Sequence, residues 1–185
     1  MKKTILIVAT CWFMFSMLPG FAQTMSPKWG IETELVQPFL PNVGIIRLQA
    51  TRTITSLTGT NRGDLLVGVY IRPNVRHDIV EKINEYMLMV GYRQFVWRGL
   101  HLEGKTNIGF SEGTKNRFDG KDYNHLSWFW EANAGYLFSL AGKGRSGLYL
   151  LPQAGVISSI SSNIGPRGGE SDTFPQASLI VGFQF

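Results

Sequence analysis

The fold is decided by the stretch Pro175-Gln176-Ala177-Ser178-Leu179-Ile180-Val181-Gly182-Phe183-Gln184-Phe185. Every second residue from Pro175 to Phe185 is apolar, and the residues between them are polar or small except at Ile180. This period of two predicts a β-strand with one apolar and one polar face. The end of a soluble domain usually frays into water, whereas the last strand of an outer-membrane barrel closes the cylinder and turns its apolar face to lipid. The stretch therefore favours a membrane barrel.

The first residues of the chain have the pattern of an export signal. Lys2 and Lys3 precede an apolar run from Ile5 to Leu18, and Ala22 supplies a small residue at the end of the segment. A helix needs about 20 apolar residues to span a bilayer, so this shorter run predicts a secretory signal peptide, residues 1–22, cleaved after Ala22. Cleavage as a lipoprotein at Cys11 is disfavoured, because the apolar run continues past this residue.

Composition limits the remaining classes of protein. The 185 residues less the 22 of the leader leave 163 for residues 23–185, which is the length of one domain. Cys11 lies in the leader and is the only cysteine, so we expect neither disulfides nor thiolate metal sites. The net charge of +5 falls to +3 without Lys2 and Lys3, and the basic residues are scattered, so we expect no nucleic-acid partner. After the leader, no apolar run is long enough for a membrane helix, so any span must consist of strands.

Alternating segments recur along the whole of the expected mature chain. They predict eight strands, at residues 29–36, 44–54, 64–72, 87–97, 100–110, 123–138, 148–157 and 175–185. Arg98-Gly99 predicts a tight turn, and Pro152 predicts a β-bulge or a short strand, because proline lacks a ladder donor. The longer polar connections, at residues 74–86, 112–122 and 158–172, would all lie at the end opposite the termini. Residues 75–87 fit either a helical turn or an extension of a strand.

The two faces of these strands differ in a way that favours lipid outside and charge inside. Alternation alone also fits a soluble barrel with its apolar face inward. Large aromatic residues lie on the apolar sets and suit the interfacial girdles of a membrane barrel: Trp128, Trp130, Tyr136, Phe138, Phe183 and Phe185. The polar sets carry both signs of charge, as buried ion pairs require: Glu32, Glu34, Arg47, Arg72, Arg93, Glu103, Lys105 and Glu131. We therefore predict an all-β fold, an eight-stranded antiparallel up-and-down transmembrane β-barrel with these charges in its lumen.

The ending Gly182-Phe183-Gln184-Phe185, with the leader and the eight strands, resembles the small outer-membrane barrels of Gram-negative bacteria, of the OmpA/OmpX type. The resemblance covers the expected mature chain as architecture and does not identify a subfamily. It implies location in the outer membrane, and recognition of the terminal strand by the barrel-assembly machinery. The family includes adhesins, structural anchors, narrow pores and a few lipid-modifying enzymes, so membership does not select a function.

The best enzymatic candidate in the sequence is the set His125, Ser127 and Glu131. His-x-Ser resembles the motif of outer-membrane lipid A deacylases, in which serine, histidine and an acid hydrolyse an ester. Side chains two residues apart on a strand are about 6.5–7 Å apart, beyond the reach of a hydrogen bond, and the expected facing directs all three into the lumen. His101, Glu103 and His125 are predicted to lie at different heights, so we expect no metal site.

The sequence thus predicts a non-catalytic outer-membrane barrel with a structural or surface-interaction role and no cofactor. Its expected partners are outer-membrane lipid, the barrel-assembly machinery and an unidentified extracellular ligand, and we expect a monomer. A lipid A deacylase-like ester hydrolase is the alternative, and a soluble periplasmic ligand-binding barrel is a third reading.

Overall fold

The fold is that of a computed structural model, which describes residues 29–55, 62–76, 80–140, 146–161 and 173–185. The predicted signal peptide and Cys11 lie outside the described residues. Nine antiparallel strands form one sheet, and a short 3-10 turn, η1 (Gln37–Phe39), follows the first strand. The strands are β1 (Trp29–Glu34), β2 (Ile46–Thr55), β3 (Arg62–Val75), β4 (Val80–Trp97), β5 (Leu100–Asn116), β6 (Tyr123–Tyr136), β7 (Phe138–Ser139), β8 (Gly147–Ser161) and β9 (Thr173–Gln184). The all-β antiparallel prediction is confirmed.

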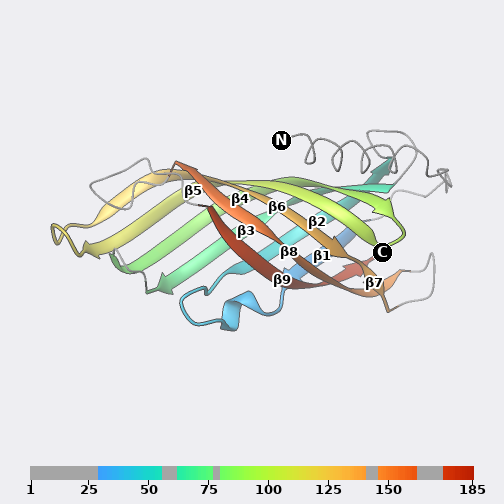
Figure 1. The fold of residues 1–185 in the computed structure, drawn as a ribbon, viewed down its shortest axis with the longest axis horizontal. Helices are drawn as coiled ribbons and strands as arrows, with labels where there is room; N and C mark the ends of the chain where they lie inside the picture. The colour runs from blue at the N-terminus through green and yellow to red at the C-terminus, as the bar shows by residue number, and fades with distance from the viewer. Residues whose placement is uncertain (1–28, 56–61, 77–79, 141–145, 162–172) are drawn as a thin grey trace, which may run out of the picture.

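The sheet closes on itself. Each strand from β1 to β5 pairs with the one that follows it, β6 pairs with β8, β8 pairs with β9, and β9 returns to β1. The two-residue β7 pairs with β8 just beyond the end of β6, so β6 and β7 together occupy one position in the wall. Eight positions therefore surround the axis (Figure 1), and the predicted sixth strand is present in two pieces.

Pro152 accounts for the break between β6 and β7. The pairing of β6 with β8 ends at Gly135↔Gln153 and resumes at Phe138↔Leu150, so it lapses beside Pro152. On the other side of β8, Pro152 stays in register with Leu179 of β9. Because proline has no N–H to donate, the discontinuity falls in the neighbouring strand, and the predicted bulge or shortening of β8 at this residue is wrong.

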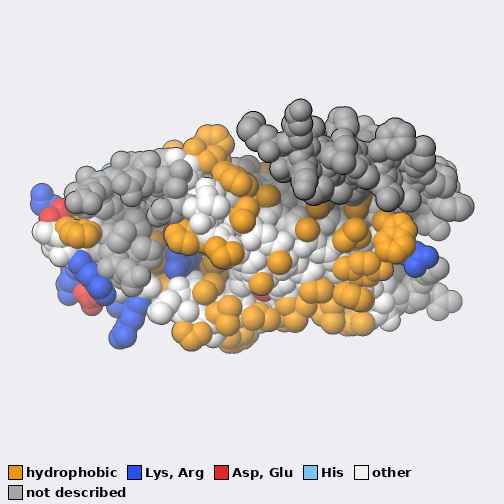
Figure 2. All heavy atoms as spheres, viewed as in Figure 1, with side chains coloured by type: hydrophobic (Ala, Val, Ile, Leu, Met, Phe, Trp, Pro, Cys, Tyr) orange, Lys and Arg blue, Asp and Glu red, His pale blue; other side chains and the backbone are white. Residues whose placement is uncertain are grey.

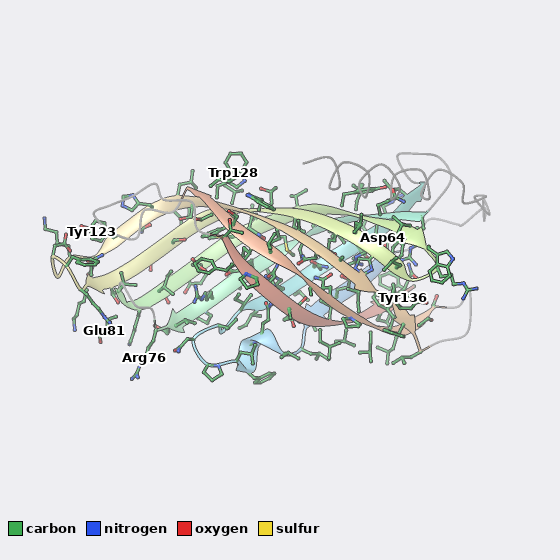
Figure 3. The ribbon with its side chains drawn as sticks, viewed as in Figure 1. Asp64, Arg76, Glu81, Tyr123, Trp128 and Tyr136 are labelled. Carbon is green, nitrogen blue, oxygen red and sulfur yellow. The ribbon has the colours of Figure 1, made fainter. Side chains whose placement is uncertain are left out.

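The strands that extend furthest beyond their predicted bounds are β4 and β5. β4 begins at Val80, where it pairs with Asn116 at the end of β5, so parts of the expected loops at 74–86 and 112–122 are strand. Between residues 80 and 87, strand extension and not a helical turn is therefore observed. These extensions form the end opposite the C-terminus, where Glu81 and Tyr123 lie in Figure 3. These extensions lack a regular alternation of apolar and polar residues, because no single apolar face is needed there. The sequence therefore indicated loops at these positions.

The barrel wall is inverted relative to that of a soluble protein. Among the described residues, 22 of the buried side chains are polar or charged and 11 are hydrophobic. Large hydrophobic side chains are instead exposed, including Val67 at 59% and Leu88 at 65%, and they cover much of the surface in Figure 2. Burial in a closed sheet means facing the interior, so the polar face of each strand points inward.

Candidate functional site

The candidate site is the charged interior of the barrel. Its central part, which we call the interior network, comprises Glu32, Glu34, Arg47, Asp64, Arg93, Glu103, Lys105 and Glu131. The residues come from the six consecutive strands β1 to β6. All are buried, and alternation places each on the inner face of its strand.

Arg93 is the centre of one half of the network. Its Nη1 lies 2.7 Å from Glu32 Oε1 and its Nη2 lies 2.6 Å from Glu103 Oε2. Asp64 is more distant, at 3.9 Å. β1 and β4 are separated by two strands in the sheet, so the Arg93–Glu32 pair can form only across the interior. Glu32 also accepts a hydrogen bond of 2.6 Å from the Tyr149 hydroxyl.

Lys105 and Arg47 continue the network on the other side. Lys105 Nζ lies 2.8 Å from Glu103 and 3.5 Å from Glu131. Arg47 lies 3.1 Å from Glu131 and 3.7 Å from Glu34. The charges thus alternate in one continuous series, Glu32–Arg93–Glu103–Lys105–Glu131–Arg47–Glu34. Each cation lies between two carboxylates, which is the arrangement that compensates the large cost of burying charge.

Neutral donors add hydrogen bonds to two carboxylates of this series, Glu131 and Glu32. Glu131 accepts hydrogen bonds from the side-chain amides of Asn107, at 2.9 Å, and Gln176, at 3.0 Å. Gln49 donates to Glu32. The hollow beside Arg47, lined by Glu32, Glu34 and Gln49 among others, is too small for a water molecule. The interior here is packed with polar side chains.

Arg72 is part of a separate cluster nearer the loop end. Its guanidinium donates to the backbone carbonyls of Val43, at 3.0 Å, and Asn42, at 2.8 Å. It lies 3.7 Å from Glu85, which also accepts from the Tyr70 hydroxyl at 3.1 Å. The position of Arg72 thus differs from that of the other predicted lumen charges, which belong to the continuous series.

Sequence reasoning missed two acids of the interior, Asp64 and Glu85. Asp64 shares a face with Leu66, Gly68, Tyr70 and Arg72 in the alternating pattern, so a signal for it was present. Glu85 fell in the segment interpreted as a loop, where no facing was assigned. The structure buries both carboxylates.

The enzymatic candidate set is not assembled for catalysis. Glu131 is held by Arg47, Lys105 and Gln176. The Ser127 hydroxyl is buried and has no hydrogen-bond partner in the described structure. The His125 ring packs against Tyr123, with centroids 6.1 Å apart, and is partly exposed. No hydrogen bond in the described structure connects the three residues, so the nucleophile has no base and the base has no orienting acid.

The described residues also contain no group of three or more histidines, cysteines, aspartates or glutamates arranged to hold a metal ion. His101 is fully buried and its ring lies 3.5 Å from the Gln153 side-chain oxygen. No helix in the described segments has both the length and the hydropathy to cross a bilayer.

The aromatic residues singled out in the sequence lie on the outer face. Trp128, Trp130, Phe138, Phe183 and Phe185 are exposed, and Tyr136 is half-buried against Phe138, with ring centroids 4.7 Å apart. The Trp128 indole N–H donates to the Thr106 hydroxyl on the next strand, 2.5 Å away. Figure 3 places Trp128 and Tyr136 at well-separated heights on the barrel.

Comparisons with known proteins add one finding. No protein-family model and no curated protein matches the sequence. Among solved structures, the fold is similar to the crystal structure of the N-terminal β-barrel domain of Pseudomonas aeruginosa OprF, with 15% identity and a TM-score of 0.42. The match covers 86% of this chain and 96% of that domain.

Proposed function

We propose that this protein is a non-catalytic outer-membrane β-barrel of a Gram-negative bacterium, of the small OmpA/OmpX type, with a structural or surface-interaction role. The observation that carries the proposal is the inverted wall, in which hydrophobic side chains are exposed and polar or ionisable ones are buried. An exposed apolar surface of this extent is unfavourable in water, and a closed barrel satisfies every ladder group without water.

The spacing of the aromatic residues fits the thickness of a membrane. Trp128 and Tyr136 are eight positions apart on β6. With a rise of roughly 3.3 Å per residue and a tilt of about 40°, they are separated by roughly 20 Å along the axis. This is close to the apolar band of about 25 Å that membrane barrels present between their aromatic girdles.

The packed interior supports a structural role over that of a general pore. An eight-stranded barrel is just wide enough to be filled by its side chains, and here the ionic series from Glu32 to Glu34 crosses it. We expect very small or no conductance in a planar bilayer. A large, steady conductance would contradict a filled lumen.

Packing within the barrel also constrains the terminal strand, in addition to its proposed recognition by the barrel-assembly machinery. A Cβ added at Gly182 would lie 2.2 Å from Cζ of Tyr149, so the tyrosine ring rests directly on this glycine. That contact places the Tyr149 hydroxyl on Glu32. Gly182 in the ending Gly182-Phe183-Gln184-Phe185 therefore has a packing role as well.

The proposal is tested by expressing the full sequence and fractionating the cells. We expect the protein in the outer-membrane fraction, shortened by 22 residues, soluble only in detergent and faster in gels when unheated. Protein that stays in water without detergent, with its tryptophans shielded from aqueous quenchers, would refute the membrane barrel. Incubation with lipid A or phospholipid should leave the lipid unchanged, and hydrolysis that is lost in Ser127→Ala would establish the enzymatic alternative.

A further inference from the structure

Two arginines at the end of the barrel that carries the C-terminus lie over tryptophan rings. The Arg52 guanidinium carbon is 4.8 Å from the centroid of Trp29, and that of Arg98 is 4.7 Å from the centroid of Trp97. We call these four residues the terminal rim. Arg52 and Arg98 are exposed, as are both indoles, at 46% for Trp29 and 53% for Trp97.

Backbone pairing places both pairs at this end. Trp29 exchanges hydrogen bonds of 3.1 and 2.9 Å with Phe185, and it pairs with Arg52 in the ladder between β1 and β2. Arg98 lies in the turn between β4 and β5 with a φ of 52°, and the next residue, Gly99, accepts a bond from Leu137. Tyr136 and the C-terminus lie at the same end in Figures 1 and 3.

The two ends of the barrel differ in their exposed charge. The described acids that reach solvent are Glu81, Glu112, Asp119 and Asp122, and all belong to the hairpins of the opposite end. A third arginine near the terminal rim, Arg62, also lies on a ring, that of Phe95, but Asp64 holds it at 2.8 Å. Among the ion pairs of the described residues neither Arg52 nor Arg98 takes part, so both exposed guanidinium groups of the terminal rim are available to a ligand.

The chemistry of this arrangement selects a phosphate ester. A guanidinium is weakly hydrated and matches phosphate through two parallel N–H donors. The contact with the face of an indole attracts the guanidinium through its charge, while N–H groups that point away from the ring stay available. Tryptophan rings themselves favour the headgroup level of a bilayer. The apolar surface continues directly from the rim through the exposed rings of Phe183 and Phe185.

We propose that the terminal rim binds the headgroups of anionic glycerophospholipids in the leaflet that contacts this end of the barrel. The acyl chains lie along the exposed apolar wall, and the phosphodiester of a lipid at either pair accepts hydrogen bonds from Arg52 beside Trp29 or from Arg98 beside Trp97. This inference rests on the proposed membrane location of the outer face. It adds a preference for anionic over zwitterionic lipid, which does not follow from the membrane barrel alone.

The test is native mass spectrometry of the protein, expressed from the full sequence and purified from membranes in non-ionic detergent. Dimyristoyl phosphatidylglycerol and dimyristoyl phosphatidylcholine are added in turn at equal concentration. One arginine near an anionic membrane surface contributes about 1 kcal/mol, which corresponds to about fivefold in affinity. We therefore expect phosphatidylglycerol to bind at least about fivefold more tightly, and high salt to reduce this ratio.

The double variant Arg52→Gln/Arg98→Gln should bind both lipids equally. The matched control, Arg76→Gln/Lys82→Gln, removes two exposed cations from the opposite end and should keep the preference. Equal binding of the two lipids by the unmodified protein, or an undiminished preference in the double variant, would overturn the inference. The salt dependence of the unmodified protein provides a measurement that needs no variant. Heat-modifiable migration, recorded on the same samples, separates failure of the lipid preference from failure of the membrane barrel.

Discussion

The interior and the loop end of this barrel contain the same kind of ion pair in opposite surroundings. Arg93 and Glu32 lie 2.7 Å apart with side chains 0% exposed. Lys115 and Glu81 lie 3.2 Å apart with side chains 72% and 54% exposed. In Figure 2 the loop end shows acidic and basic side chains together on the surface, whereas the middle of the barrel shows mostly hydrophobic ones.

The difference shows why similar distances have different consequences. An exposed pair exchanges strong hydration for a weak attraction and contributes little. A buried pair loses all hydration, so each partner depends on the other, and removal of one leaves an uncompensated charge. The five experiments below test this contrast, starting with the largest expected effect.

Replacing Arg93 should have the largest effect. Arg93→Met leaves Glu32 and Glu103 buried without their shared cation, and we expect the free energy of unfolding to fall by about 3–5 kcal/mol. Urea titration of the refolded protein in lipid, followed by tryptophan fluorescence, measures the change. Arg76→Met, at an exposed position, is the control and should stay within about 0.5 kcal/mol. A loss below about 1 kcal/mol for Arg93→Met would show that the interior is hydrated.

An arginine placed on the outer wall tests whether the exposed apolar face contacts lipid. Val90 is 52% exposed near the middle of β4, so Val90→Arg should cost about 2–4 kcal/mol in a bilayer. Phe110→Arg, nearer the loop end of the apolar wall, should cost about 0–1 kcal/mol. Equal losses in the free energy of unfolding for the two variants would mean that the edge of the apolar bilayer core does not lie between Val90 and Phe110.

Gly182→Ala sharpens the comparison at a single interior contact. The added methyl would displace the Tyr149 ring, on which a Cβ would lie 2.2 Å from Cζ, and would pull its hydroxyl from Glu32. We expect a loss of about 1–3 kcal/mol in the free energy of unfolding. The double variant Tyr149→Phe/Gly182→Ala should lose less than the two single losses combined, because both changes break the hydrogen bond from the Tyr149 hydroxyl to Glu32.

The exposed pair should respond weakly. Glu81→Gln should lower the free energy of unfolding by less than about 1 kcal/mol, and the effect should vanish at 1 M salt, where charges are screened within about 3 Å. A larger loss, or one that persists in salt, would mean that the ion pair at the loop end stabilises the protein as strongly as the buried pairs of the interior.

The smallest change is a local titration at the tip of the hairpin between β5 and β6. The Tyr123 hydroxyl and the Lys121 amide donate to Asp119 and hold the pKa of this exposed carboxyl below its ordinary value. The contribution of these hydrogen bonds to the free energy of unfolding is therefore fully present above the ordinary aspartate pKa of about 3.9. It is lost as pH falls through the lower pKa of Asp119 in the folded protein. In Tyr123→Phe the pKa of Asp119 should rise, which carboxyl NMR can follow. An unchanged pKa would mean that the hydroxyl is not a donor in solution.

Much of the architecture could be predicted because alternation reports facing directly. A side chain two residues along a strand returns to the same face, so sets such as Leu65, Val67 and Val69 specify the outer wall without any tertiary information. The turn at Arg98-Gly99 could be predicted for a similarly local reason, and the structure has it there.

The interior pairing could not be predicted, because alternation gives the face of a residue and not its height. Strand tilt and register decide that Arg93 meets Glu32 of a distant strand while Arg72 meets backbone carbonyls near the loop end. The extensions from Val80 and to Asn116 were missed for the opposite reason. Outside the apolar wall both faces of a strand tolerate polar residues, so the period of two disappears although the ladder continues.

The pairing of β1 with β9 has a consequence for how the molecule is made. Glu34 lies opposite Ile180 in that ladder. The first described strand, β1, can therefore pair with its second neighbour, β9, only after nearly the whole polypeptide has been synthesised. Contacts between such distant positions make folding slow. During this interval β1 has an open edge that could pair with other chains. The topology therefore leaves this edge of β1 exposed until β9 has been made and has paired with it.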